Sequence, residues 1–194
     1  MRSEDHAHPA GRTLAELVRE KTGVDVARCY QCGKCSAGCP LAAEMDFPPS
    51  QIMHLFQLGD FPQFAEQALR SNTIWLCLTC EICFCRCPME LDIPKVMDAL
   101  RHESLAMKKV NPKAKDILAF HRAFLDSVRY TGRLFEMGQV VDYKLRSGHF
   151  LQDMLQAPWM FFVGKLHLLP ERIRGRSLLA RIFAKTLKAK EKRS

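Results

Sequence analysis

Nine cysteines in one part of the chain are the residues whose types and spacing could do chemistry. Residues 29–40 read CYQCGKCSAGCP, and residues 77–88 read CLTCEICFCRCP. Each stretch has three cysteines at intervals of three residues, then a fourth cysteine four residues later that is followed by proline. Cysteine thiolates bind zinc and iron–sulfur clusters. The two matched stretches therefore predict binding of a metal ion or a cluster.

The spacing favours two [4Fe–4S] clusters over structural zinc. A zinc site needs two cysteine pairs, whereas each stretch here supplies a triplet and an outlying Cys-Pro. The same spacing occurs in bacterial two-cluster ferredoxins. The fourth cysteine of each stretch lies too near its own triplet to bend back onto the same cluster, so we expect it to reach the other one. The predicted ligands are Cys29, Cys32, Cys35 and Cys87 for one cluster, and Cys77, Cys80, Cys83 and Cys39 for the other.

The ninth cysteine, Cys85, aligns with Ala37 of the first stretch and not with a ligand. We expect it to pack as a small apolar side chain near the cluster. A spare ligand or a redox-active thiol is the alternative. Its neighbour Arg86 aligns with Gly38 and either lies near the anionic cluster or is solvated. No catalytic residue is predicted, because the chain has no glycine-rich phosphate loop and no recognisable nucleophile arrangement.

Cysteine use and hydropathy indicate an intracellular protein. The first 28 residues contain no apolar run, and the longest uncharged stretch near the C-terminus, residues 154–164, is too short to span a bilayer. Clustered cysteines in an unsecreted chain more often bind metal than form disulfides. We therefore expect a cytoplasmic protein without a transmembrane segment.

Helical signals dominate the elements that must position the cysteines. The segment TLAE at 13–16 predicts a helix ending near Gly23, and Ser50 is expected to cap a helix that closes at Gly59. Further helices are expected from Pro62 to about Ser71 and from Pro94 onward. Later predicted helices are one with Ile117, Phe120, Phe124 and Val128 on one stripe, two weaker ones at about 133–146 and 149–156, and a basic one at 177–192.

No segment shows a strand-like alternation, and 37 residues separate the two motifs. We therefore predict an all-α fold, an α-helical ferredoxin core with a C-terminal helical extension. The expected domains are a disordered N-terminus at 1–12, a two-cluster ferredoxin domain at 13–110 and a partner-docking extension at 111–194.

At these residues the chain resembles HdrC, the iron–sulfur subunit of soluble heterodisulfide reductases, a family within the α-helical ferredoxin superfamily. The resemblance rests on the two cysteine stretches, the helical spacer and the basic helical C-terminus, over roughly residues 13 to 190. It implies an iron–sulfur subunit that relays electrons through two [4Fe–4S] clusters. The electrons would pass from HdrA, which contains flavin and clusters, to HdrB, which reduces a disulfide.

Other members of the superfamily are alternatives that the chain fits less well. Iron–sulfur subunits of succinate dehydrogenase or fumarate reductase add an N-terminal [2Fe–2S] domain, for which there is no room before Cys29. Those of the glycolate oxidase type append cysteine-rich modules, but this chain has no cysteine after Cys87. An electron-transfer role in such a dehydrogenase stays open, as does a free ferredoxin carrier.

Charge is divided unevenly along the chain. Residues 1–94 hold 8 Lys and Arg against 12 Asp and Glu, a balance of −4, whereas residues 95–194 hold 21 against 9, a balance of +12. A basic half can bind nucleic acid, but no nucleic-acid-binding module is recognisable, so an iron–sulfur regulator is disfavoured. We expect the basic half to dock on an acidic partner, with Trp159, Met160, Phe161 and Phe162 as its apolar anchor or, alternatively, as part of its own core.

Overall fold

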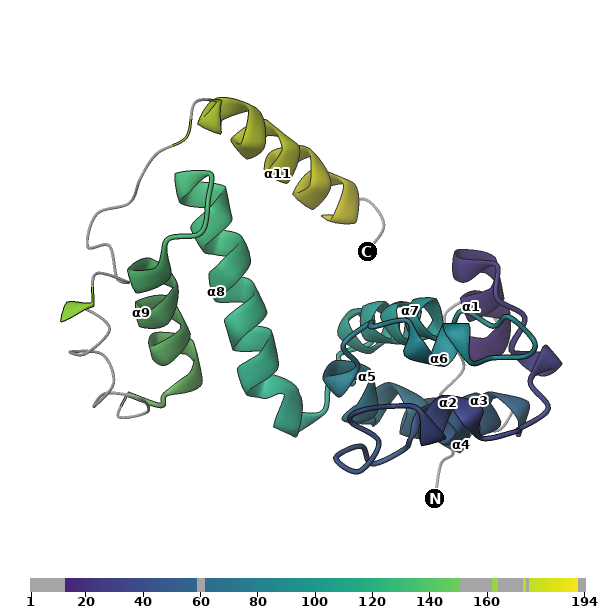
Figure 1. Ribbon diagram of the computed structural model, residues 1–194. Helices are drawn as coiled ribbons and strands as arrows, with labels where there is room; N and C mark the ends of the chain where they lie inside the picture. The colour runs from purple at the N-terminus through teal and green to yellow at the C-terminus, as the bar shows by residue number, and fades with distance from the viewer. Residues whose placement is uncertain (1–12, 59–61, 151–161, 164–172, 174, 192–194) are drawn as a thin grey trace, which may run out of the picture. The chain divides into compact units, whose positions relative to one another are not determined.

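The computed structural model describes residues 13–58, 62–150, 162–163, 173 and 175–191 (Figure 1). These residues form helices and contain no strand, so the predicted all-α fold is confirmed. They fall into two compact units, residues 1–112 and 113–194, and each unit is described by itself. The predicted disordered segment 1–12 lies outside the described residues.

The first unit contains eight of the helices. They are α1 (Leu14–Thr22), the 3₁₀ turn η1 (Val26–Arg28), α2 (Lys34–Ala37), α3 (Pro49–Gln57), α4 (Pro62–Arg70), α5 (Thr73–Leu76), α6 (Ile82–Cys85) and α7 (Ile93–Ala106). A second 3₁₀ turn, η2 (Pro112–Ala114), follows at the end of the unit. The two cysteine stretches include the one-turn helices α2 and α6, which contact each other.

Local sequence signals set the ends of α1 and α7. Thr13 and Glu16 form a reciprocal capping box, and Gly23 ends α1 in the left-handed conformation, as predicted. Asp92 caps α7 by accepting a hydrogen bond from the Lys95 amide, and Pro94 lies in the first turn. The helix therefore begins at Ile93, one residue before the predicted start.

The prediction that Ser50 caps its helix is wrong. Helix α3 begins at Pro49, with Pro48 at the cap position, so Ser50 already lies inside the first turn. Its hydroxyl instead lies 2.7 Å from the hydroxyl of Ser36, and its amide donates to that same Ser36 oxygen at 2.8 Å. Ser50 thus links α3 to the helical turn α2 of the first cysteine stretch.

The core of this unit lies between α1, α3, α4, α5 and α7. Its fully buried large side chains include Val18, Ile52, Met53, Ile74, Val96, Met97 and Leu100. Burial of an aliphatic side chain of this size stabilises a fold by about 1.5–3 kcal/mol. A salt bridge from Lys21 on α1 to the buried carboxylate of Glu103 also joins α1 to α7. The core therefore fixes α3 and α7, the two helices that follow the cysteine stretches.

The second unit is built around a pair of helices. Helix α8 (Lys115–Thr131) ends at Gly132, whose φ of 88° is left-handed, and α9 (Glu136–Ser147) packs against it. Ser127 accepts a hydrogen bond from the Phe135 amide at 2.8 Å, and Arg146 bonds Asp126 at 2.7 Å. Helix α11 (Arg176–Glu191) packs on α8 and matches the predicted basic helix.

The apolar stripe predicted for α8 is not its buried face. Phe120 and Phe124 are 48% and 39% exposed, whereas Ala119 and Ala123 are buried. The small alanines allow α9 to approach α8 closely, which leaves the larger phenylalanines at the surface. The weak helix expected at 133–146 is α9, and the one expected at 149–156 lies almost entirely outside the described residues.

A search of the described helices finds none that is long and apolar enough to cross a membrane.

Candidate iron–sulfur site

The two cysteine stretches have the same backbone path. Gln31 and Gly33, on either side of Cys32, have φ values of 59° and 74°. Thr79 and Glu81, on either side of Cys80, have φ values of 52° and 63°. A non-glycine residue in this left-handed region costs about 1–2 kcal/mol, so the repeated conformation is specific to these loops. Each loop then enters a one-turn helix that carries its third cysteine, Cys35 in α2 or Cys83 in α6.

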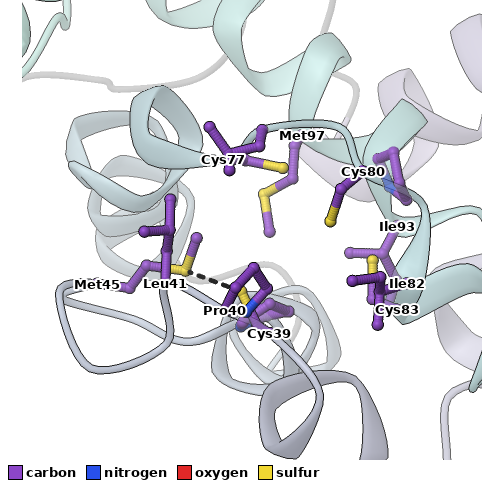
Figure 2. Close-up of a pocket in the computed structure, with 13 residues that line it drawn as sticks. Cys39, Pro40, Leu41, Met45, Cys77, Cys80, Ile82, Cys83, Ile93 and Met97 are labelled. Carbon is purple, nitrogen blue, oxygen red and sulfur yellow. Dashed lines mark hydrogen bonds between the residues drawn. The ribbon is translucent and has the colours of Figure 1, made fainter.

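One pocket in the first unit is lined by cysteines from both stretches (Figure 2). The four cysteines that line it are Cys39, Cys77, Cys80 and Cys83. Its apolar lining comprises Pro40, Leu41, Met45, Pro49, Leu78, Ile82, Ile93, Pro94 and Met97. In Figure 2 Cys39 lies beside Met45, with 4.0 Å between their sulfur atoms, and the other three cysteines lie around the rest of the pocket. The set contains the fourth cysteine of the first stretch and the triplet of the second.

The remaining four cysteines are related through Tyr30. The pKa of Tyr30 is raised by partial desolvation, by a hydrogen bond with Cys32 and by the thiolates of Cys32, Cys87 and Cys29. The ring is still 57% exposed, so it lies at the surface beside these thiols. Cys35 is buried and interacts with Cys29. Cys87, which belongs to the second stretch, therefore lies near the triplet of the first.

Burial keeps several of these thiols protonated. It raises the pKa of Cys83 to about 12, with a further contribution from the neighbouring Cys77. Burial is also the main cause of the raised pKa values of Cys35 and Cys77. A cysteine must lose its proton to bind iron. Buried, mutually repelling thiols suit a site whose metal centre supplies the compensating positive charge.

Polar side chains outside the cysteine stretches hold the loops in place. Gln57, the last residue of α3, donates a hydrogen bond to the carbonyl of Cys29. Arg101 of α7 donates to the carbonyls of Ile74 and Cys77. The amide of Leu91 donates to the sulfur of Cys87 at 3.4 Å. Each loop is thus fastened to the helix that follows it.

Asp46 ties the end of the first stretch to the beginning of the second. Its carboxylate accepts bonds from the amides of Asn72, Thr73 and Phe47 and from the Thr73 hydroxyl, at 2.6–3.1 Å. Partial burial acts to raise the pKa of Asp46, but these hydrogen bonds outweigh it and lower that pKa. The carboxylate therefore joins the loop after Cys39 to α5, the helix that leads into Cys77.

A family model described as a 4Fe-4S dicluster domain matches residues 28–92. Over 113 residues the chain is 34% identical to the HdrC iron–sulfur subunit of a CoB–CoM heterodisulfide reductase from Methanopyrus kandleri, and the match covers 56% of each chain. It is 34% identical over 103 residues to the HdrC protein of a ferredoxin:CoB–CoM heterodisulfide reductase from Methanosarcina acetivorans, covering 50% of this chain and 39% of that one. The chain belongs to the HdrC family of heterodisulfide reductases.

A third member of the family, the HdrC protein of an H(2):CoB–CoM heterodisulfide,ferredoxin reductase from Methanothermobacter marburgensis, is 26% identical over 109 residues. That match covers 56% of this chain and 57% of the relative. The chain thus spans about half the length of the curated relatives it matches. The matched residues include both cysteine stretches, and the predictions of the family and of two [4Fe–4S] clusters are confirmed.

The donor set in this member of the HdrC family fits cubane clusters. In the described part of the chain, no three His, Cys, Asp or Glu side chains converge as they would around one metal ion. A cubane has four irons, each of which takes its own thiolate, so its ligands do not need to converge on one point. The crossed ligation of Cys39 and Cys87 stays a prediction, and the grouping of the cysteines is compatible with it.

Cys85 and Arg86 differ in part from expectation. Cys85 is exposed, so the prediction that it packs as a small apolar side chain is wrong. Arg86 is exposed and lies against Gly38, where an added Cβ atom would stand 2.3 Å from its Nη1 atom and 2.6 Å from its Cδ atom. Glycine at position 38 therefore makes room for Arg86 where the two stretches meet.

Sequence reasoning missed the residues that fasten the loops. Asp46 lies in the Asp-x-Pro pattern that follows the first stretch, and Asp92 begins the same pattern after the second. That repetition could have marked Asp46 as structural. Gln57 and Arg101 carry no comparable signal, because each lies within an ordinary amphipathic helix.

Proposed function

We propose that this chain is the electron-transfer subunit of a heterodisulfide reductase-type complex. Electrons would pass through two [4Fe–4S] clusters from HdrA, which contains flavin and clusters, to the disulfide-reducing HdrB. The observation that carries the proposal is the pairing of two cysteine stretches in one helical unit whose family is HdrC. The chain covers only part of its relatives, so the activity of the whole complex is inferred from those relatives.

In this proposal the side chains of the chain hold and insulate the clusters and do no chemistry of their own. The ligands would be Cys29, Cys32, Cys35 and Cys87 for one cluster and Cys77, Cys80, Cys83 and Cys39 for the other. The clusters, when bound, supply one-electron transfer. Apolar side chains such as Met45, Ile93 and Met97 line the pocket of the second set and limit access of water.

The second unit would provide the docking surface. Its described part exposes several large apolar side chains: Phe120, Leu125, Val140, Val141, Leu145 and Phe162, the last of them 83% exposed. Of the predicted anchor, Trp159, Met160 and Phe161 lie outside the described residues. The balance of +12 over residues 95–194 supports an acidic partner, because opposite charge orients and accelerates docking. The proposed electron acceptor is HdrB, and the proposed location is the cytoplasm.

Anaerobic purification of the tagged chain from its native cells tests the proposal. The expected result is co-elution of a flavin-containing chain and of a cysteine-rich chain that reduces a disulfide, at a salt concentration low enough to keep charged surfaces paired. The first disulfide to test is the CoB–CoM heterodisulfide that appears in the relatives' names. Co-elution of a dehydrogenase of the succinate or glycolate type would instead support the second candidate function.

A further inference from the structure

The first cysteines of the two stretches occupy equivalent positions but are held by unequal side chains. The carbonyl of Cys29 accepts a hydrogen bond from the neutral amide of Gln57. The carbonyl of Cys77 accepts one from the guanidinium of Arg101, which also bonds the carbonyl of Ile74. One loop is therefore fastened by a dipole and the other by a full positive charge.

Arg101 is also the cation best placed to act through protein and not through water. Its side chain is only 21% exposed, and its three hydrogen bonds fix it at the C-terminal end of α5, next to Cys77. The other cations of the loops, Lys34 and Arg86, are more open to solvent, so water and salt weaken their effect. A charge in a less polar environment acts more strongly on its neighbours.

The sulfur of Cys77 already responds to this charge. Burial raises the pKa of Cys77, and the guanidinium of Arg101 opposes that rise by stabilising the thiolate. The same interaction stabilises the extra negative charge that a cluster gains on reduction. Charge and hydrogen bonding around the sulfurs are among the factors that set the reduction potential of an iron–sulfur cluster.

We propose that Arg101 raises the reduction potential of the cluster bound by Cys77, Cys80 and Cys83 and thereby makes it the first of the two to be reduced. Arg101 acts as a positioning residue, because it reaches the cluster through the carbonyl of Cys77 and through its charge. One electron enters the cluster, and no bond is formed or broken. The inference requires Cys77 to be a ligand but does not depend on which residue is the fourth one.

Asp98 and Glu81 are the carboxylates that face this charge. Arg101 Nη1 donates to Asp98 Oδ1 at 2.8 Å, and Asp98 is 56% exposed. Glu81 is exposed on the loop itself and interacts with Lys95, which is paired with Asp92. Because Asp98 offsets part of the Arg101 charge, its removal should change the potential in the opposite direction.

An anaerobic redox titration of the full-length, cluster-loaded chain, followed by EPR, tests the inference. The signal of the second cluster is first assigned as the one perturbed by Cys80→Ser. Arg101→Gln should then lower its midpoint. At the wild-type midpoint, the ratio of reduced to oxidised cluster should fall about tenfold, equivalent to about 59 mV for one electron. The other cluster should shift less.

Three further variants separate charge from structure. Arg101→Lys keeps the charge but loses the planar fork, so the midpoint should stay near wild type even if stability falls. Asp98→Asn should raise the midpoint and covers the case in which Arg101→Gln does not load its clusters. Arg70→Gln, which removes a charge from an exposed pair with Glu66, is the matched control and should shift neither cluster.

Three results would overturn the inference: an unchanged midpoint in Arg101→Gln, an equal shift of both clusters, or a second cluster that is reduced last in the wild type. If Arg101→Gln does not load, an unchanged midpoint in Asp98→Asn would also overturn it. The titration uses the isolated chain, so a negative result leaves the proposed function to be judged by co-purification.

Discussion

The thiols of the cysteine stretches differ in how readily they lose a proton. Cys83 has its pKa raised to about 12 by burial and by Cys77, whereas Cys85, two residues later, is exposed. The thiolate and not the thiol is the nucleophile in alkylation. A single short segment thus contains one protected thiol and one accessible thiol, which can be compared in the same experiment.

In cluster-free protein at pH 8, we expect iodoacetamide to modify Cys85 at least about tenfold faster than Cys83. A raised pKa keeps Cys83 protonated until higher pH, so its rate should increase as the pH rises toward 12. Mass spectrometry of the modified peptides resolves the two sites. Equal rates at pH 8 would contradict the buried position of Cys83.

The predicted crossed ligation can be tested with one serine substitution. Cys39→Ser should perturb or remove the EPR signal of the cluster bound by Cys77, Cys80 and Cys83, because Cys39 lines the same pocket as those residues. Cys85→Ala is the matched control and should leave both signals in place. Loss of the signal assigned to the Cys29, Cys32 and Cys35 set in Cys39→Ser would refute the crossing.

Hydrogen bonds between elements hold the two stretches together. Asp46 is the clearest case, since it fastens the loop after Cys39 to α5 through hydrogen bonds to Asn72 and Thr73. We expect Asp46→Asn to lower the free energy of unfolding by about 1 kcal/mol, because hydrogen bonds to a charged group are worth about 1.5–3 kcal/mol and Asp46 is exposed enough for water to reduce that value.

The pH dependence of the Asp46 effect follows from the lowered pKa of that carboxyl. A lowered pKa stabilises the folded state at neutral pH, and the contribution disappears only when the pH falls below the usual aspartate range. Anaerobic urea titrations of the wild type and Asp46→Asn should therefore differ by the same amount at pH 8 and pH 5.5. Glu44→Gln, an exposed substitution on the same loop, is the control. A difference that vanishes at pH 5.5 would contradict this account.

Helix existence could be read from the sequence, but some helix faces and ends could not. The capping box at Thr13 and the apolar spacing of Val96, Met97 and Leu100 predicted α1 and the buried face of α7 correctly. The α8 stripe was misjudged because periodicity identifies a helix face but not its partner. Here the alanines Ala119 and Ala123 face inward, which only the packing of α9 reveals.

The candidate site was predictable to the extent that its information is local. The cysteine spacing alone predicted the clusters. The contacts of Arg101, Gln57 and Asp46 span 24–28 residues of sequence and depend on how helices pack, so no local pattern contained them. Exposure of Cys85 was likewise a consequence of where α6 lies and not of its neighbours in sequence.

At the scale of the whole molecule, the ligands and the basic charge lie in different parts of the chain. All the cysteines precede residue 88, whereas the positive balance lies after residue 94. The first unit, with its own buried core, ends at Pro112. This division suggests that cluster binding and docking can be separated experimentally.

A truncation after Pro112 should keep both EPR signals but no longer co-purify with the partner chains, because it lacks the exposed apolar and basic surface. EPR and affinity purification of the truncated and full-length chains make the comparison. Loss of the clusters or failure to fold would show that the second unit belongs to the core of the protein. Retained co-purification would place docking on the first unit.

Electron relay to a disulfide is the central claim, and reoxidation of the reduced clusters tests it most directly. The co-purified complex and the isolated chain are each reduced with dithionite, freed of excess reductant and mixed anaerobically with the CoB–CoM heterodisulfide. Our account predicts that both EPR signals disappear in the complex and persist in the isolated chain. Persistence of the signals in the complex, or their loss in the isolated chain, would contradict it.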